Sequence, residues 1–212
     1  MMQDAPLSSP LLEDLRQSIT LTGDTGHDVA TFLIVHGCPQ TARHCGKVAT
    51  EARRVALLVG ADPALAEVSG WLHDISAIFP TPERVKIAYQ LGIPVLPEEA
   101  AFPMIVHQKL SRVLAAQVFQ IIQPEVLSAV ECHTTLKCDA SQLDKVLFVA
   151  DKLAWDQPGQ APFHEGMQAA LEISLDAATF FYLRYMWERR EQLAVLHPWL
   201  HDAYFQMLQS KF

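Results

Sequence analysis

The sequence predicts an all-α protein. Apolar residues recur at the three-to-four-residue spacing of a buried helix face along nearly the whole chain. The breaks between these segments carry residues that begin or end helices, and no stretch long enough for a strand alternates apolar and polar residues. The chain contains no internal repeat and no low-complexity tract. These observations favour a globular bundle of helices.

Helix boundaries follow from local capping residues. Asp62 before Pro63 is typical of an N-cap followed by the first helical residue, and Gly60 ends the helix before it. Ser141, with Asp144 three residues later, indicates a near capping box. The complete set of expected helices is 9–19, 27–36, 40–59, 63–76, 82–91, 104–122, 124–134, 141–155, 165–196 and 198–209.

The length suits one domain with small appendages, because 212 residues can bury a sizeable core. The segment 155–162 contains two prolines and a glycine, and it predicts the main hinge of the chain. We therefore expect an N-terminal helical appendage at 1–26, a main body at 27–157 and a C-terminal helical extension at 158–212.

Composition excludes several classes of protein. Half of the residues are hydrophobic, which argues against disorder, and a net charge of −8 argues against a general nucleic-acid-binding surface. No apolar run approaches the ~20 residues that span a bilayer, and no signal peptide is visible, so we expect a cytoplasmic protein without membrane contact. Four cysteines without a Cys-x-x-Cys spacing fit a reducing cytosol. The sequence leaves open whether the protein forms a homodimer.

Polar residues fall on the apolar faces of five predicted helices. They are His44, His73 with Asp74, His107, His133 and Asp151. One such histidine is commonly a core residue bonded to a carbonyl, and one such aspartate is commonly ion-paired. Five cases would each need a separate buried partner, whereas a metal centre would satisfy them all. Histidine and aspartate without cysteine point to iron or manganese rather than structural zinc.

The order of these residues matches a known pattern. His44, then His73-Asp74, then Asp151, resembles the HD-domain superfamily of metal-dependent phosphohydrolases. The additional His107, the segment His133-Thr134-Thr135 and the segment Ala150-Asp151-Lys152 make the chain similar to the YqeK family within that superfamily. The resemblance extends over about 40–157.

The resemblance implies an HD-domain helical bundle around a dinuclear metal site, with iron as the metal and manganese as the alternative. It implies that His44, His73, Asp74 and Asp151 hold one ion, that Asp74 bridges to the second, and that His107 and His133 complete the second ion's ligands. It further implies that a small-molecule nucleotide, diadenosine tetraphosphate, is hydrolysed to two ADP by attack of a metal-bridging hydroxide. His73 and Asp74 would be the catalytic residues.

Three positions depart from the family pattern and leave the substrate open. Ala77 replaces a common lysine, Leu136 replaces the glycine after His-Thr-Thr, and Gln157 stands in a segment that usually contains an arginine. One alternative is therefore an HD phosphohydrolase acting on another nucleotide or small phosphoester. A second alternative is a non-catalytic HD domain that senses nucleotides.

Residues next to the expected ligands are candidates for accessory roles. Basic residues could contact substrate phosphates, or they could simply form a solvated surface; they are Arg43, Lys109, Arg112 and Lys152. Thr134 and Thr135 are candidates to fix the imidazole tautomers.

The remaining unusual residues have ordinary interpretations. Five histidines match no motif position, and we expect them at the surface or at helix caps: His27, His36, His164, His197 and His201. Cys45 and Cys132 adjoin expected ligands, but we interpret them as packing residues. An aromatic stretch near the C-terminus could be a nucleotide platform, although packing onto the body or a dimer seam is the favoured interpretation; it comprises Phe180, Phe181, Tyr182, Tyr185 and Trp187.

Overall fold

The computed structural model describes residues 9–156 and 159–210. Over these residues it is built from α-helices and short 3-10 helices, with no strand, so the prediction of an all-α fold is confirmed. The α-helices are α1 (Pro10–Gln17), α2 (Thr25–Val35), α3 (Pro39–Val59), α4 (Pro63–Leu72), α5 (Arg84–Gln90), α6 (Pro97–Ala101), α7 (His107–Gln117), α8 (Pro124–Cys132), α9 (Gln142–Leu153), α10 (His164–Ile173), α11 (Leu175–Glu188) and α12 (Pro198–Gln209). The 3-10 helices are η1 (Ile75–Ile78), η2 (Thr81–Glu83), η3 (Pro103–Val106) and η4 (Arg190–Gln192).

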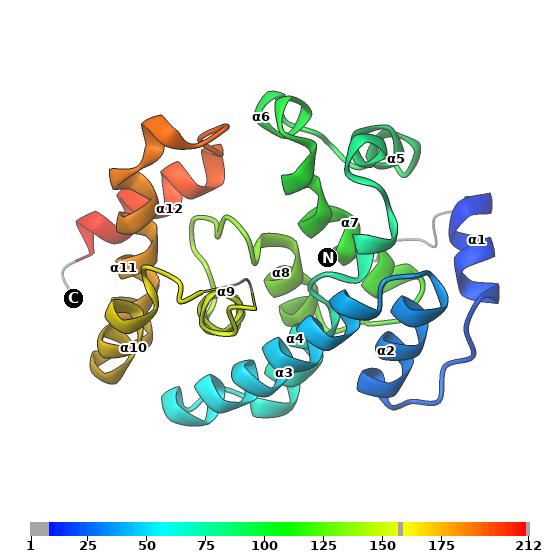
Figure 1. The fold of residues 1–212 in the computed structure, drawn as a ribbon, viewed down its shortest axis with the longest axis horizontal. Coiled ribbons are helices and arrows are strands. Elements are labelled where there is room, and N and C mark those ends of the chain that lie inside the picture. The colour runs from blue at the N-terminus through cyan, green and yellow to red at the C-terminus, as the bar shows by residue number, and fades with distance from the viewer. Residues whose placement is uncertain (1–8, 157–158, 211–212) are drawn as a thin grey trace.

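The helices enclose one continuous apolar core. Helix α3 packs against α4 and α9, and α8 packs against α7 and α9. In Figure 1 the C-terminal helices α10–α12 lie at one end of the molecule and α1 and α2 at the other, with α8 and α9 between them. Leu72, Leu110, Leu147 and Phe148 are fully buried in this core. Helices α4, α8 and α9 also pack against one another in pairs.

The predicted caps are present. Asp62 accepts hydrogen bonds from the backbone N–H groups of Ala64 and Leu65 at the start of α4. Ser141 accepts from Asp144 N, and the Asp144 carboxylate accepts from Ser141 N, which completes a capping box at the start of α9.

Gly70 allows α4 to lie directly on α3. A Cβ added at this position would lie 2.5 Å from Cα of Ala49, so a larger residue would push the two helices apart. This approach matters because His44 lies on α3 and His73 follows the end of α4.

Two predicted helices are interrupted where a histidine takes a backbone carbonyl. The helix expected at 63–76 ends at Leu72, and the one expected at 104–122 begins as the 3-10 helix η3. The imidazole of His73 faces Gly70 O at 2.7 Å, and that of His107 faces Met104 O at 2.6 Å.

Other segments also differ from the prediction, among them the helix expected at 104–122, which ends at Gln117. The single helix expected at 165–196 is divided into α10, α11 and η4, because Ser174 adopts an extended backbone and its hydroxyl caps Ala177 N. The five-residue helix α6 was missed, since it is too short to show a periodic apolar face. Among the described residues, no helix is both long enough and apolar enough to cross a bilayer.

Candidate metal centre

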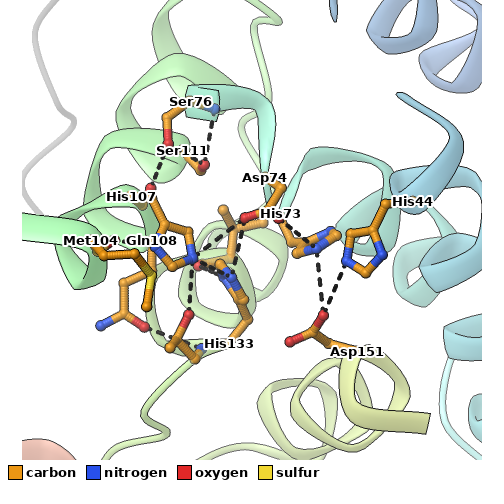
Figure 2. Close-up of polar contacts among 12 residues, drawn as sticks. His44, His73, Asp74, Ser76, Met104, His107, Gln108, Ser111, His133 and Asp151 are labelled. Carbon is orange, nitrogen blue, oxygen red and sulfur yellow. Dashed lines mark hydrogen bonds and ion pairs between the residues drawn. The ribbon is translucent and has the colours of Figure 1, made fainter. Parts of the chain in front are cut away.

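The six predicted ligands converge at the centre of the bundle, where their side chains point toward one another (Figure 2). Each comes from the end or the inner face of a different element, apart from the neighbours His73 and Asp74. The contributing residues are His44 on α3, His73 and Asp74 after α4, His107 at the start of α7, His133 after α8 and Asp151 on α9.

The first half of the centre is formed around Asp151. Oδ1 of Asp151 lies 3.4 Å from Nε2 of His44 and 3.6 Å from Nε2 of His73. The same His73 nitrogen lies 3.5 Å from Oδ2 of Asp74. Two ligands bound to one ion at ~2.1 Å are separated by about 3.0–3.5 Å, so this spacing suits a shared cation.

The second half is formed around the other oxygen of Asp74. Oδ1 of Asp74 lies 3.3 Å from Nε2 of His107 and 3.6 Å from Nε2 of His133. The two imidazole nitrogens lie 3.0 Å apart. Asp74 therefore stands between the two halves and presents one carboxylate oxygen to each.

Backbone carbonyls set the tautomer of three histidines. Nδ1 of His73, His107 and His133 faces the carbonyl three residues earlier, at 2.7, 2.6 and 2.8 Å respectively. A carbonyl only accepts, so each Nδ1 carries a hydrogen, and Nε2 of each ring points inward. Thr134 also contacts one of these rings, since its hydroxyl lies 3.0 Å from Nε2 of His107, whereas among the described residues no hydrogen bond joins Thr135 to an imidazole.

The inward nitrogens fit a metal rather than a closed hydrogen-bond network. Nε2 of His73 is fully buried and has no hydrogen-bond partner. A buried polar atom without a partner is costly, and a lone pair without a donor is what a metal ligand requires. Two groups of ligand atoms lie close enough together to hold ions, and they are His44, His73 and Asp151, and His73, Asp74 and His133.

The charge states also fit metal binding. Burial raises the pKa of Asp74, but His73 and the other imidazoles outweigh it and hold that pKa far below its ordinary value. Burial likewise opposes ionisation of Asp151, yet Lys152 and His44 hold its pKa well below the ordinary value. Burial lowers the pKa of His107 to about 4. At neutral pH these groups are therefore carboxylates and a neutral imidazole, the forms that bind metals.

Lys152 and Asp156 contact ligands of the first half without being candidate ligands themselves. Nζ of Lys152 donates to Oδ2 of Asp151 at 3.0 Å and to the backbone carbonyl of His133. Oδ2 of Asp156, which the sequence analysis missed, lies 3.2 Å from Nδ1 of His44. Asp156 follows the end of α9, where helical periodicity gives no signal.

Polar side chains also surround the second half. The hydroxyl of Thr134 lies 3.0 Å from Nε2 of His107. Gln108 accepts from Thr134 N at 3.2 Å and donates to Thr135 Oγ1 at 3.1 Å, which links α7 to the turn after α8. Thr134 thus lies at the inward side of the ring, where a bound ligand would also lie.

The four candidate substrate cations lie in different surroundings. Arg43 is exposed and hydrogen-bonded to Gln40, and Arg112 forms an ion pair with Glu131 at 3.6 Å. Lys152 is buried behind Asp151. The placement of Lys109 contradicts the expected phosphate contact, because its buried ammonium donates to Glu99 Oε2 at 2.8 Å and to Pro94 O at 3.0 Å.

Arg84 is a cation near the centre that the sequence analysis missed. Its Nη1 donates to Met104 O at 3.2 Å, the carbonyl that also accepts from His107. Burial lowers the pKa of Arg84, while the charge of Asp74 raises it. No motif marks this residue, since it is brought to the centre only by the packing of α5 against η3.

One departure from the family pattern is accommodated by the backbone. Leu136 has φ of 58°, a left-handed conformation that favours glycine, and its side chain is 1% exposed in the core. The turn after His133 therefore keeps a glycine-like backbone. Ala77 lies in η1, and Gln157 lies outside the described residues.

The other histidines and cysteines follow their predicted roles in most cases. His197 caps α12 by accepting from Trp199 N, but it is buried rather than at the surface, because its Nε2 lies 3.1 Å from Glu99 Oε1. His27 is exposed, and His36, His164 and His201 are half-buried. Cys45 and Cys132 are buried in the core.

The aromatic stretch separates into two groups. Phe180 and Trp187 stack on Tyr204 of α12, so these residues pack the C-terminal helices together. Tyr182 and Tyr185 instead contact Phe163 in the segment before α10.

Comparison with known families agrees with this geometry. The family model for the HD domain matches residues 41–156, which include all six candidate ligands. The chain belongs to the HD-domain family. The predicted HD-domain helical bundle is thereby confirmed.

Two relatives are similar to parts of this chain. The HD-domain protein is 45% identical over 138 residues to an uncharacterised protein in the pepC 5' region of Lactococcus lactis subsp. cremoris, covering 65% of this chain and 70% of that one. It is 27% identical over 112 residues to a probable nicotinate-nucleotide adenylyltransferase/Ap4A hydrolase of Mycoplasma genitalium, and that match spans 52% of this chain but 31% of the relative.

A solved structure shares the fold of this HD-domain protein. It is named a predicted HD superfamily hydrolase involved in NAD metabolism, from Clostridium acetobutylicum, and it superposes with a TM-score of 0.80 at 22% identity. The match covers 91% of this chain and 100% of that one.

Proposed function

We propose that this HD-domain protein is a metal-dependent phosphohydrolase that cleaves a phosphoanhydride bond of a dinucleoside polyphosphate, converting diadenosine tetraphosphate to two ADP. The observation that carries the proposal is the position of Asp74, whose Oδ2 lies near Nε2 of His73 and whose Oδ1 lies near Nε2 of His107 and of His133. Such a carboxylate suits two neighbouring ions.

His44, His73 and Asp151 would hold one ion, His107 and His133 would hold the other, and Asp74 would contact both. Two metal ions would supply a hydroxide nucleophile at neutral pH and neutralise charge on the phosphoryl oxygens. The donor set of imidazole and carboxylate, without thiolate, supports iron, with manganese as the alternative.

The residues of the chain hold this arrangement before substrate binds. Backbone carbonyls keep the three imidazoles in one tautomer, and Lys152 keeps the outer oxygen of Asp151 occupied. Asp74 and His73 are the catalytic residues of the proposal because they would lie next to the reacting phosphoryl group. Thr134 offers a hydroxyl at the same inward position.

The choice of diadenosine tetraphosphate as substrate is supported by the name of one relative. The name of the Mycoplasma genitalium relative includes Ap4A hydrolase, but this chain matches only 31% of the length of that protein. A different nucleotide or small phosphoester remains the alternative substrate, since position 77 provides no cation. The cytoplasmic location and the homodimer stay predictions.

One experiment distinguishes these alternatives. Purified protein is analysed for bound metal and incubated with diadenosine tetraphosphate and added Fe²⁺ or Mn²⁺, with products separated by chromatography. ADP as the sole product supports the proposal, whereas ATP with AMP contradicts symmetrical cleavage. Tight binding without turnover across a nucleotide panel would instead indicate a sensor. The variant Asp74→Asn is expected to be inactive. Its control is Asp14→Asn, which changes an exposed residue of α1.

A further inference from the structure

A set of hydrogen bonds joins the segment that follows Asp74 to the segment that contains His107. The first segment is the 3-10 helix η1, which begins directly after Asp74 and packs against α7. The second consists of η3 and the start of α7, where His107 is the first residue. Oδ1 of Asp74 and Nε2 of His107 lie 3.3 Å apart in the second half of the centre. The way in which η1 is held against α7 therefore affects the spacing of these two candidate ligands.

Two buried serines make the inner contact between the segments. The hydroxyl of Ser76, in η1, donates to the backbone carbonyl of His107 at 2.9 Å (Figure 2). The hydroxyl of Ser111, in α7, donates to Ser76 Oγ at 3.0 Å and accepts from Ser76 N at 3.2 Å. Both serines are fully buried. Because hydrogen bonds are stronger in a protein interior than in water, this pair fixes η1 on α7 next to His107.

Arg84 makes a second contact between the same segments. Its Nε donates to the carbonyl of Phe79, the residue directly after η1, at 3.1 Å, and its Nη1 donates to the carbonyl of Met104, in η3, at 3.2 Å. The Met104 carbonyl also faces Nδ1 of His107 at 2.6 Å. Arg84 therefore connects the end of η1 to the carbonyl that orients the ring of His107. We give the name polar clamp to the three residues Ser76, Arg84 and Ser111.

The two serines of the clamp differ from other buried hydroxyl residues of the chain. Ser69 and Thr179 are equally buried, but each donates to the carbonyl four residues earlier in its own helix. Such a bond does not hold one element on another. Ser76 and Ser111 instead join two elements that are 35 positions apart in the chain. They therefore hold elements together, and they do so beside two candidate ligands.

We propose that the residues of the polar clamp are positioning residues for the second metal ion, because they hold Asp74 and His107 at the spacing that one ion requires. The inference rests on the two-ion centre of the proposed function, but not on the substrate or on the bond that is cleaved. The first ion depends less on the clamp, since His44 and Asp151 come from α3 and α9. Loss of the clamp should therefore weaken binding of one ion and spare the other.

A role in fold stability alone is the competing explanation. Loss of a buried hydrogen bond destabilises most proteins, and a general loss of stability would weaken binding of both ions alike. The charge of Arg84 gives a second distinction. Removing a cation beside a metal site favours metal binding on electrostatic grounds, whereas removing a positioning contact disfavours it. Weaker Mn²⁺ binding without Arg84 would therefore come from lost geometry and not from lost charge.

The test measures Mn²⁺ binding by titration, with electron paramagnetic resonance to distinguish a spin-coupled pair of ions from an isolated ion. Wild-type protein is expected to bind two Mn²⁺ per chain as a spin-coupled pair. Ser76→Ala should bind the second ion roughly 10- to 100-fold more weakly, as loss of a contact behind a metal ligand does, with the affinity for the first ion unchanged. Ser69→Ala is the matched control, because it also removes a fully buried hydroxyl, but one bonded within α4.

Variants of the other two residues test the clamp as a unit. Ser111→Ala should have a smaller effect than Ser76→Ala, since the bond from Ser76 to the His107 carbonyl remains. Arg84→Met should also weaken binding of the second ion. Arg84→Lys keeps the charge but lacks the planar fork that contacts two carbonyls, so it should behave as Arg84→Met does. Circular dichroism verifies folding, and the half-buried position of Arg84 provides a variant for the test if a serine variant unfolds.

Several outcomes overturn the inference. Spin-coupled ions bound with wild-type affinity in both Ser76→Ala and Arg84→Met would show that the clamp does not position the second ion. Equal weakening of both ions in Ser76→Ala would assign the serines to fold stability, and stronger Mn²⁺ binding in Arg84→Met would show that Arg84 acts only through its charge. Wild-type protein that binds a single Mn²⁺ would contradict the two-ion centre itself. Two bound ions without cleavage of diadenosine tetraphosphate would contradict only the proposed reaction, so the two proposals fail separately.

Discussion

Nε2 of His107 and Nε2 of His133 lie 3.0 Å apart, although each ring already uses its Nδ1 hydrogen on a backbone carbonyl. Two imidazole lone pairs and a carboxylate oxygen of Asp74 thus meet in one small space. Three acceptors repel one another unless a cation lies between them. The fold holds them together before any ligand binds, and metal binding should relieve the repulsion.

Metal should therefore stabilise the folded protein. A ligand that binds the folded state at 100 times its Kd raises the free energy of unfolding by about 2.7 kcal/mol. We expect Fe²⁺ or Mn²⁺ to raise the Tm of chelator-treated protein, and Mg²⁺, which prefers oxygen ligands, to have a smaller effect. Thermal unfolding with each metal measures this. An unchanged Tm with both transition metals would show that the centre does not bind them.

Asp74 and Asp151 should differ in how much metal their loss removes. Asp74 faces both halves of the centre, whereas the candidate ligands paired with Asp151 are His44 and His73. Asp74→Ala should lose both ions and remain folded, while Asp151→Ala should retain metal in the His107 half. Metal content per chain, with circular dichroism as the folding control, checks this. Wild-type metal content in Asp74→Ala would refute the bridging position.

Lys152 should affect metal affinity through Asp151. Its buried ammonium neutralises the outer oxygen of Asp151 and reaches the carbonyl of His133. Loss of an outer contact to a metal ligand typically lowers metal affinity by about 10- to 100-fold. Lys152→Met should therefore weaken Mn²⁺ binding in a titration. Lys145→Met is the matched control, because Lys145 lies on the same helix and pairs with Asp176, away from the ligands. If both variants weakened Mn²⁺ binding equally, the contact between Lys152 and Asp151 would not set the metal affinity.

Glu99 should make stability depend on acid pH. Burial raises its pKa, but His197, Leu96 N and Lys109 outweigh burial and lower the pKa in the folded protein. A lowered folded pKa means that this carboxylate stabilises the fold fully above its unfolded pKa, about 4.3. The contribution is lost as pH falls through the lowered folded value.

The variant Glu99→Gln tests this contribution. It leaves the buried Lys109 without its counter-ion, so the free energy of unfolding at pH 7 should fall by about 3 kcal/mol. The difference from wild type should shrink as pH falls below about 4. Urea unfolding at both pH values measures it, with the exposed Glu125→Gln as control. A difference independent of pH would contradict ionisation of Glu99 as its cause.

The sequence was sufficient for features that depend on local chemistry. Capping by Asp62 and Ser141, and the apolar faces that include His44 and His133, could be predicted because each depends on residues a few positions apart. The end of α4 and the 3-10 start before α7 were not predicted, and at both places an imidazole contacts the carbonyl three residues earlier. Asp156, Arg84 and the Glu99–Lys109 pair required tertiary packing, which no spacing in the sequence encodes.

The approach of α4 to α3 at Gly70 should control metal affinity from outside the centre. A Cβ at this position would lie 2.5 Å from backbone atom Cα of Ala49, which cannot move without the helix. Gly70→Ala should therefore reduce the free energy of unfolding by about 1–3 kcal/mol, as overpacking does, and weaken Mn²⁺ binding by separating His44 from His73. Gly46→Ala is the matched control on α3, because its Cβ would meet a side-chain atom of Trp71, at 2.9 Å, and not a backbone atom. If Gly70→Ala binds Mn²⁺ as tightly as Gly46→Ala does, the spacing of α3 and α4 does not set the geometry of the centre.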